Sequence, residues 1–258
     1  MLCKNRRTQD KDRASTSRID GRNTLESCMI SRRKYLVWDF DGTLGYRPGQ
    51  WSGALVQVLR RFAGLEVDIE TLRPFLQTGF PWHSPDRANP AMRDANDWWE
   101  ALVPVFQRAF MACGLSPEDS RLLAGEVRSV YTDVGGWRLY EDTSDVLSEL
   151  RQEGWNHAIL SNHVPELPAL IAGLGLGSLI GHISNSAETG FEKPHPRAFQ
   201  SVLEALEAPD DVWMIGDSIQ ADVLGAESIG LRAILVRSED PRASRRAADL
   251  QDVRRFLS

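Results

Sequence analysis

The sequence is poor in cysteine and has no long hydrophobic run. Its three cysteines, Cys3, Cys28 and Cys113, are odd in number and far apart, which fits neither a disulfide framework nor the paired spacing of a zinc site. No stretch reaches the roughly eighteen apolar residues that a membrane helix needs, and the N-terminal segment has no apolar stretch of signal-peptide type. We therefore expect a cytoplasmic protein that is neither secreted nor membrane-bound.

An excess of positive charge is confined to the N-terminal segment. Residues 1–34 hold ten Lys or Arg against four Asp or Glu, although the whole chain of 258 residues has a net charge of −6. The segment has no apolar period, so we predict a disordered basic tail. A basic tail could bind nucleic acid or target an organelle, but its acidic residues argue against a transit peptide. The acidic remainder gives no nucleic-acid signature, and no nucleic-acid partner is expected.

From residue 35 the sequence changes to short apolar runs separated by amphipathic segments. Four runs are typical of buried parallel strands: residues 35–38, 157–160, 212–215 and 233–236. Amphipathic segments at 165–174, 196–207 and 219–229 lie between the later runs and have the spacing of helices. This alternation predicts an α/β fold with a doubly wound, mainly parallel sheet.

A long helical insertion separates the first apolar run from the second. Helices are predicted at 52–64, 68–78, 94–112 and 117–130, with Ser116 and Pro117 in the positions typical of a helix start. We therefore predict a core domain of residues 35–46 and 139–258 and an inserted helical cap domain of residues 47–138. Within the cap, Trp82 and His83 lie in a proline-bounded loop that could line an active-site entrance.

Polar residues follow three of the four apolar runs. Asp39 follows the first run, Ser161 the second, and Asp217 comes two residues after the third. Ligands of open α/β sheets bind beyond the carboxyl ends of the strands. We therefore expect these residues to converge on one crevice.

The first polar cluster reads Asp39-Phe40-Asp41-Gly42-Thr43. Alternation along an extended chain sends Asp39 and Asp41 to the same side, so one carboxylate could attack phosphorus while the other acts as general acid and base. Gly42 lets the chain turn so that amides can face a phosphate, and Gly42 and Thr43 are candidate substrate-binding residues. An ordinary turn after a strand would use similar residues.

Two further clusters supply polar groups to the predicted crevice. Ser161 and Asn162 could hold a phosphoryl oxygen, although such a pair is also common in turns and helix caps. Lys193, in a loop fixed by prolines, could offset the charge of nucleophile and phosphate, or it could be an ordinary surface lysine. His195 is better explained as a loop or helix-start residue than as a metal ligand.

The last cluster contains two aspartates. Asp217 would meet Asp39 at the strand ends, where a few carboxylates together with water and phosphate oxygens suit magnesium. Asp222, one helical turn later, would support the site through hydrogen bonds or face solvent in the first turn of a helix.

The order of these four clusters resembles the haloacid dehalogenase superfamily. The resemblance covers about residues 35–240, and the sequence of residues 190–199 looks like a phosphatase-like branch that has a helical cap. It implies that Asp39 is the nucleophile, that Asp41 is the acid and base, and that Ser161 and Lys193 contact the phosphoryl group. Asp39, the main-chain carbonyl of Asp41 and the side chain of Asp217 would bind Mg²⁺.

The resemblance implies a magnesium-dependent phosphomonoester hydrolase that acts on a small phosphorylated molecule through an aspartyl-phosphate. Asp41 favours a phosphatase over a haloacid dehalogenase, because halide leaves without a proton. A phosphomutase is a weaker match, because mutases often lack the counterpart of Thr43. A non-catalytic binding protein with the same fold is the alternative of another class. A monomer and a homodimer are both compatible with the sequence.

Overall fold

The computed structural model describes residues 33–86, 88 and 94–257. Most of the predicted tail, residues 1–32, lies outside the described residues. Its last two residues belong to the folded body, because Lys34 begins strand β1 (Lys34–Trp38) and the backbone N–H of Arg33 donates to Asp210 Oδ2 at 2.9 Å. The folded region therefore begins at least two residues before the predicted boundary.

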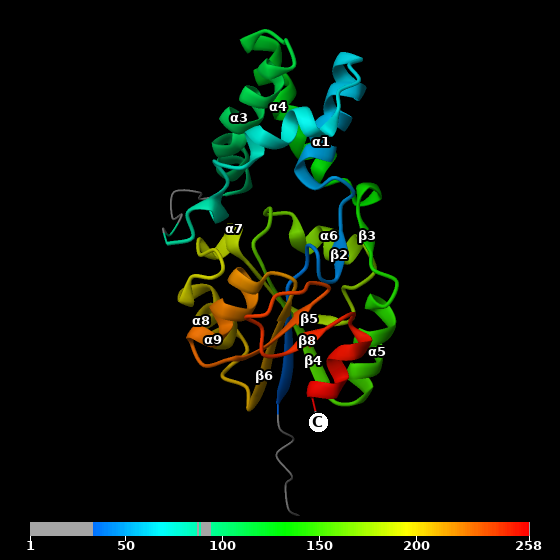
Figure 1. Ribbon diagram of the computed structural model, residues 1–258, viewed down its shortest axis with the longest axis vertical. Coiled ribbons are helices and arrows are strands. Elements are labelled where there is room, and N and C mark those ends of the chain that lie inside the picture. The colour runs from blue at the N-terminus through cyan, green and yellow to red at the C-terminus, as the bar shows by residue number, and fades with distance from the viewer. Residues whose placement is uncertain (1–32, 87, 89–93, 258) are drawn as a thin grey trace, which may run out of the picture. The chain divides into compact units, whose positions relative to one another are not determined.

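Six strands form one sheet, in the order β5-β4-β1-β6-β7-β8 (Figure 1). After β1 they are β4 (Trp155–Ser161), β5 (Ile180–Asn185), β6 (Asp211–Gly216), β7 (Arg232–Val236) and β8 (Arg246–Ala247). All neighbours in this sheet pair in parallel. The four predicted runs lie in β1, β4, β6 and β7, and the predicted doubly wound parallel sheet is confirmed.

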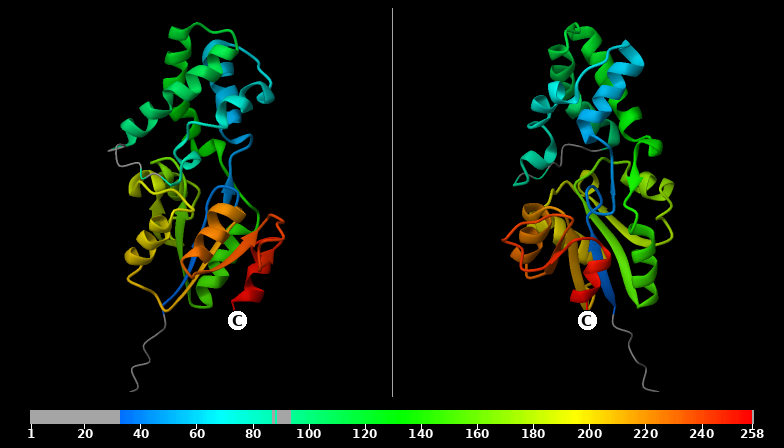
Figure 2. Two further views of the ribbon diagram at one scale, coloured as in Figure 1. Left: turned by 60° about the vertical axis from the view of Figure 1, so that its left-hand side comes forward. Right: turned by 45° about the vertical axis from the view of Figure 1, so that its right-hand side comes forward.

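Helices cover both faces of the sheet, as Figure 2 shows. They are α5 (Thr143–Gln152), α6 (Leu167–Gly173), α7 (Ser186–Thr189), α8 (Pro196–Ala205) and α9 (Gly225–Ser228), the last preceded by a π-helical segment at Ile219–Leu224. Strand β1 shows why both faces need cover: Leu36 and Trp38 belong to one buried apolar cluster and Val37 to the other. Side chains alternate between the two faces along a strand. A central strand whose side chains are all apolar therefore needs helices packed against both faces of the sheet.

The segment between β1 and β4 is helical, as predicted. It contains α1 (Gln50–Val58), α2 (Ile69–Leu72), α3 (Ala95–Ala112) and α4 (Pro117–Tyr131). The predicted helix 52–64 ends in a π-helical turn and the predicted helix 68–78 in a 3-10 turn. The Ser116 side chain accepts a hydrogen bond from the Asp119 N–H, so it caps α4 as expected. These helices are called the cap helices below.

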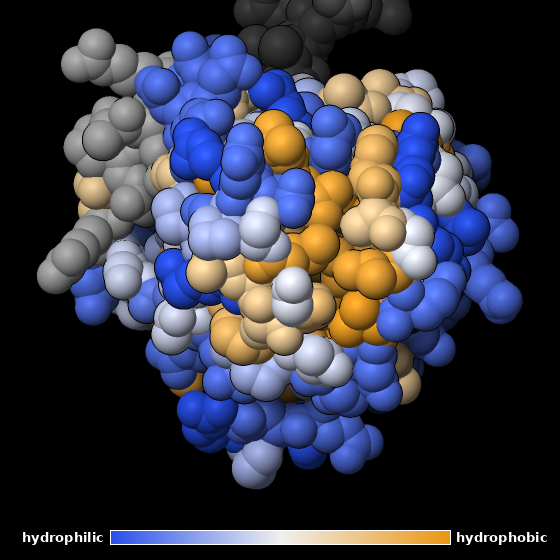
Figure 3. All heavy atoms as spheres, turned by 90° about the horizontal axis from the view of Figure 1, so that it is seen from above, coloured by the Kyte–Doolittle hydropathy of each residue, from blue (hydrophilic) through white to orange (hydrophobic). Residues whose placement is uncertain are grey.

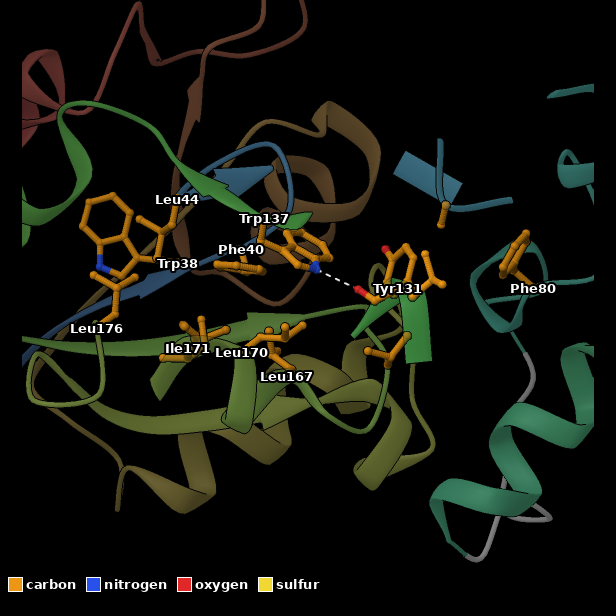
Figure 4. Packing of buried hydrophobic residues seen from close by; sticks show 14 of the residues in the cluster. Trp38, Phe40, Leu44, Phe80, Tyr131, Trp137, Leu167, Leu170, Ile171 and Leu176 are labelled. Carbon is orange, nitrogen blue, oxygen red and sulfur yellow. Dashed lines mark hydrogen bonds between the residues drawn. The ribbon is translucent and has the colours of Figure 1, made fainter. Parts of the chain in front are cut away.

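Two short strands join the cap helices to the sheet. Strand β2 (Gly45–Tyr46) pairs antiparallel with β3 (Arg138–Leu139), so the outgoing and returning chains run side by side. Buried aromatic side chains continue from the sheet along this crossing, among them Phe40, Trp137 and Tyr131 (Figure 4). Trp137 Nε1 donates to the Tyr131 carbonyl at 2.9 Å. The end of α4 is therefore anchored close to the first strand.

The surface of the cap helices is partly apolar. Phe62, Met111 and Leu122 are exposed, and Figure 3, which looks onto the cap end, shows an apolar patch among polar side chains. These three residues do not line the cavity described below. Within residues 33–86, 88 and 94–257, no helix is long and apolar enough to cross a membrane.

Candidate active site

The strand order brings the predicted polar residues together. Strand β1 lies between β4 and β6, so Asp39, which follows β1, is flanked by Ser161 at the end of β4 and by Asp217 just after β6. The Asp39 N–H donates to the Ile215 carbonyl at 2.9 Å and holds the backbone of Asp39 against β6. Three segments that are distant in sequence thus supply one site at the carboxyl edge of the sheet.

Asp39 is held by a hydroxyl and an ammonium group. Ser161 Oγ donates to Asp39 Oδ1 at 2.9 Å, and Lys193 Nζ donates to the same oxygen at 2.8 Å. In the described part of the chain, Asp39 Oδ2 has no hydrogen bond. The carboxylate is therefore oriented through one oxygen while the other is available for chemistry.

Lys193 is a buried cation shared by two carboxylates. Its side chain is almost fully buried, and Nζ also donates to Asp222 Oδ1 at 2.6 Å. Burial alone would lower the pKa of Lys193, but the negative charges of Asp222 and Asp39 raise it above its ordinary value. Lys193 is thus a protonated ammonium group, and Asp222 is a buried partner rather than a solvent-facing residue.

Asn162 acts on the backbone of Lys193. Its Nδ2 donates to the Lys193 carbonyl at 2.9 Å, and its Oδ1 accepts from the Lys193 N–H at 2.7 Å. Asn162 was expected to bind substrate, and it does line the cavity described below. The structure uses both ends of its amide to fix the loop that carries the lysine, so the side chain positions Lys193.

Asp41 is a buried acid close to Asp39 and Asp217. Burial raises the pKa of Asp41 to about 7, and the charges of Asp39 and Asp217 act in the same direction. Asp41 Oδ1 is buried and has no hydrogen-bond partner among residues 33–86, 88 and 94–257. A carboxyl group that can gain or lose a proton near neutral pH suits general acid and base catalysis.

Gly42 and Thr43 form the turn that follows Asp41, and their part in substrate binding stays a prediction. The Gly42 N–H donates to the Gly45 carbonyl at 2.8 Å and the Thr43 N–H to the Phe40 carbonyl at 3.2 Å, so these amides serve the turn itself. Neither residue lines the cavity, and Thr43 is fully buried. Gly42 instead permits a close approach: a Cβ there would lie 2.4 Å from Asp217 Oδ2.

The carboxylates form a pocket suited to a divalent cation. One oxygen each from Asp39, Asp217 and Asp222 lies within 4.8 Å of the others. Both oxygens of Asp222 are already engaged, by Lys193 Nζ and by the Ser218 N–H. Burial and neighbouring carboxylates raise the pKa of Asp217 above its ordinary range. A hard cation with oxygen ligands would relieve this excess of negative charge, so the donor set fits Mg²⁺.

A cavity of about 550 Å³ opens over these groups. Its lining includes Asp39, Asp41, Ser161, Lys193 and Asp217, and the cap helices and their connections contribute further residues, Gln50, Trp51, Trp82, Asp86 and Tyr131. The two loop residues proposed for the entrance differ in which cavities they line. Trp82 lines both this cavity and a neighbouring one, whereas His83 lines the neighbouring one and not this one.

Tyr131 and His163 also line the cavity, although neither was predicted from the sequence. Tyr131 stacks on Trp51 with ring centroids 3.8 Å apart. His163 is buried beside Trp137, and burial lowers its pKa to about 4. His163 follows the Ser161-Asn162 pair directly, so its position next to two candidate site residues could have predicted that it lies in the site. Tyr131 lies at the C-terminal end of α4, and no motif in the sequence marks it.

His195 lies at the start of α8. Its Nδ1 accepts from the Arg197 N–H at 3.1 Å, which is the helix-start position that the sequence suggested.

Sequence comparison places the chain among known hydrolases. Residues 34–230 match the family model of the haloacid dehalogenase-like hydrolases. The chain is 37% identical over 247 residues to a phosphoserine phosphatase of Thermus thermophilus, a match that covers 85% of this chain and 97% of that protein. It is 27% identical over 215 residues to haloacid dehalogenase-like hydrolase domain-containing protein 3 of Bos taurus, covering 81% of this chain and 83% of that protein.

Solved structures share the fold. The magnesium-bound HAD-hydrolase YfnB from Bacillus subtilis aligns with a TM-score of 0.68 at 21% identity and covers 88% of this chain and 99% of that one. A HAD phosphatase from Thermococcus onnurineus aligns with a TM-score of 0.60 at 24% identity, covering 87% and 98%. The fold, the site at the carboxyl edge of the sheet and the family match lead to one conclusion: this chain is an enzyme that belongs to the haloacid dehalogenase-like hydrolases.

Proposed function

We propose that the protein is a magnesium-dependent phosphatase that hydrolyses a small phosphomonoester through an aspartyl-phosphate on Asp39. The observation that carries this proposal is the environment of Asp39. Its carboxylate is oriented by Ser161 and Lys193 and shares one cavity with Asp41, a second acid whose pKa is raised to about 7. A nucleophile and a separate proton donor are the two groups that phosphoester cleavage needs.

The proposed reaction has two steps. Asp39 attacks phosphorus, a bond forms between its oxygen and phosphorus, and the ester bond breaks while Asp41 donates a proton to the departing alcohol. Asp41, now a carboxylate, then takes a proton from water as the water oxygen attacks the aspartyl-phosphate. Phosphate leaves and Asp39 returns to its initial state. The ammonium group of Lys193 offsets negative charge in both steps.

Asp39, the main-chain carbonyl of Asp41 and Asp217 would hold Mg²⁺. When bound, the cation supplies positive charge that draws the phosphate to the carboxylates and stabilises the transferring phosphoryl group. Asp222 would position Lys193 indirectly, because its Oδ1 accepts a hydrogen bond from Lys193 Nζ at 2.6 Å.

Relatives and residues both favour phosphatase over the alternatives. Several relatives are named as phosphatases, including a glyceraldehyde 3-phosphate phosphatase that is 33% identical over 111 residues. Solved structures with the same fold include dehalogenases as well, so the fold by itself does not separate the two reactions. Asp41 distinguishes the two reactions, because cleavage of a phosphoester needs a proton for the leaving alcohol whereas loss of a halide does not. The chain also has Thr43, which favours a phosphatase over a phosphomutase. It has an acid at both proposed catalytic positions, Asp39 and Asp41, which argues against a non-catalytic binding protein.

Two variants and a chelator test this proposal. Phosphate release from p-nitrophenyl phosphate should need Mg²⁺, stop in EDTA and be abolished in Asp39→Asn, because an amide cannot serve as the anionic nucleophile. Asp41→Asn should slow turnover by about a hundredfold to ten-thousandfold but release a burst of nitrophenol near one per site. Wild-type rates in Asp39→Asn, or full activity in EDTA, would contradict the proposal.

Four expectations stay predictions: the cytoplasmic location, the monomeric or homodimeric state, the cap boundaries at residues 47 and 138, and the disorder of the tail over residues 1–32.

A further inference from the structure

The cavity has a catalytic floor and an outer wall. The floor consists of the carboxylates and Lys193 described above. The outer wall, which would face the leaving group of a substrate, contains Gln50, Trp51, Trp82, Asp86 and Tyr131. All five come from the segment between β1 and β4. This wall is therefore the part of the site that would distinguish one phosphomonoester from another.

Two tryptophan rings on the outer wall are held in place. Trp51 stacks on Tyr131 with centroids 3.8 Å apart and planes 10° apart, and Trp82 stacks on Phe80 at 4.7 Å and 14°. The centroids of Trp51 and Trp82 are 6.1 Å apart. Both tryptophans are only half-buried and line the cavity. Trp51 also has Phe106 nearly parallel to it, at 5.6 Å and 22°, whereas Phe80 is the one ring stacked on Trp82 in the described part of the chain. A fixed aromatic ring that turns a free face to a cavity can bind a cation there, and Trp82 is the better placed of the two.

The charges on the lining are nearly all negative. Besides the four aspartates of the floor, the wall adds Asp86, which is exposed and has no ion-pair partner within the described part of the chain. Lys193 is the one Lys or Arg among the described lining residues, and it already bridges Asp39 and Asp222. His163 is neutral near pH 7, because burial lowers its pKa to about 4.

A nearby guanidinium does not change this balance. Arg47 is buried, and its guanidinium carbon lies 5.7 Å from the centroid of the Tyr131 ring. It is not among the residues that line the cavity. A substrate with a second anionic group would therefore find no free cation on the described wall and would meet the carboxylate of Asp86.

Building on the phosphatase function proposed above, we propose that the preferred leaving group carries an ammonium group, so that the substrate class is an aminoalkyl phosphomonoester. The phosphoryl group would lie on the floor, and the ammonium group would lie against Trp51 and Trp82 with Asp86 as its counter-charge. Opposite charges across a binding site favour the right ligand, and like charges act against the wrong one. The same wall therefore disfavours carboxylate-bearing phosphomonoesters.

Three two-carbon phosphomonoesters that end in an ammonium, a hydroxyl and a carboxylate group test this proposal. They are 2-aminoethyl phosphate, 2-hydroxyethyl phosphate and phosphoglycolate, assayed by phosphate release with Mg²⁺. We expect kcat/KM to fall in that order, with the ammonium compound favoured over the neutral one by about tenfold, the scale of a partly desolvated cation over an aromatic ring. A higher kcat/KM for phosphoglycolate than for 2-aminoethyl phosphate would overturn the proposal.

Variants assign the preference to the wall. Asp86→Asn should reduce the ratio of the ammonium to the neutral substrate severalfold, and Trp82→Leu should do the same in protein that keeps its melting temperature. Asp145→Asn, which removes an exposed carboxylate from α5, outside the cavity lining, is the matched control and should leave the ratio unchanged. If Asp86→Asn leaves the ratio at its wild-type value, the assignment is wrong.

A binding measurement separates failure of this inference from failure of the phosphatase proposal. If the protein releases no phosphate from these esters or from p-nitrophenyl phosphate, the phosphatase proposal fails. Calorimetric dissociation constants for 2-aminoethyl phosphate and phosphoglycolate still test the charge preference in that case. Tighter binding of phosphoglycolate would overturn it, and tighter binding of 2-aminoethyl phosphate would support it.

Discussion

Gly42→Ala should inactivate the enzyme by displacing Asp217. Gly42 has a φ of +95°, which side chains rarely adopt, and a Cβ there would lie 2.4 Å from Oδ2 and 2.8 Å from Cγ of Asp217. Real Cβ atoms do not come this close to another heavy atom, so the carboxylate has to move by a substantial fraction of an ångström. A misplacement on the order of 1 Å at a catalytic group costs about a hundredfold in rate.

Gly64→Ala is the matched control for backbone strain. Gly64 also has a positive φ, +65°, but a Cβ there would meet no atom within 4 Å. Both variants should lose about 1–2 kcal/mol of folding stability from the left-handed backbone. At about 2–4 °C per kcal/mol for a protein of this size, the melting temperature should fall by about 2–8 °C. Only Gly42→Ala should lose activity.

The assay combines thermal unfolding with phosphate release over a range of Mg²⁺ concentrations. We expect Gly42→Ala to need more Mg²⁺ for half-maximal rate and to reach a lower maximum, because Asp217 is a proposed ligand. Gly64→Ala should follow the wild-type curve. Wild-type turnover with an unchanged Mg²⁺ dependence in folded Gly42→Ala would refute both the clash and the place of Asp217 in the site.

Two further predictions concern residues outside the cavity. His157 is buried and accepts a hydrogen bond from Trp38 Nε1 at 3.1 Å, and burial lowers the pKa of His157 from 6.5 to about 4. Its contribution to the free energy of unfolding is complete above pH 6.5 and is lost as the pH falls from 6.5 towards 4. His163 and Asp41 also titrate in this range, so the measured quantity is the difference in unfolding free energy between the wild type and His157→Gln. In denaturant titrations that difference should change by on the order of 1 kcal/mol per pH unit there. Arg237 Nε donates to the Thr43 carbonyl at 3.0 Å, with its guanidinium 3.9 Å from the Tyr140 ring centroid. Arg237→Gln should lower kcat more than it changes KM. The control is Arg245→Gln, at a half-buried position beside the Trp213 ring and outside the cavity lining; an equal effect of both would show that Arg237 does not position the Asp39 loop.

The principal elements of the fold could be predicted from the sequence, because short-range patterns specify them. The runs at 35–38 and 212–215 are apolar at every position, as strands covered on both faces must be. The Ser116 cap depends on a hydrogen bond that spans only three residues. Strand β5 was not predicted, because it lies at the sheet edge and several of its residues are only partly buried. Its sequence therefore lacks a clear apolar run.

The convergence of Asp39, Ser161 and Asp217 could also be predicted, since the carboxyl ends of parallel strands share one edge of the sheet. The roles of their neighbours depend on contacts across the fold. Asn162 turned out to hold the backbone of Lys193, 31 residues away in the chain. Gly42 makes room for Asp217 at the end of another strand. The sequence determined which strand ends carry the chemistry, because local burial patterns and chain order suffice for that. Only the tertiary structure decided that Trp82 and Tyr131 line the cavity while His83 lies in the next one, because those positions depend on how the cap helices pack over the sheet.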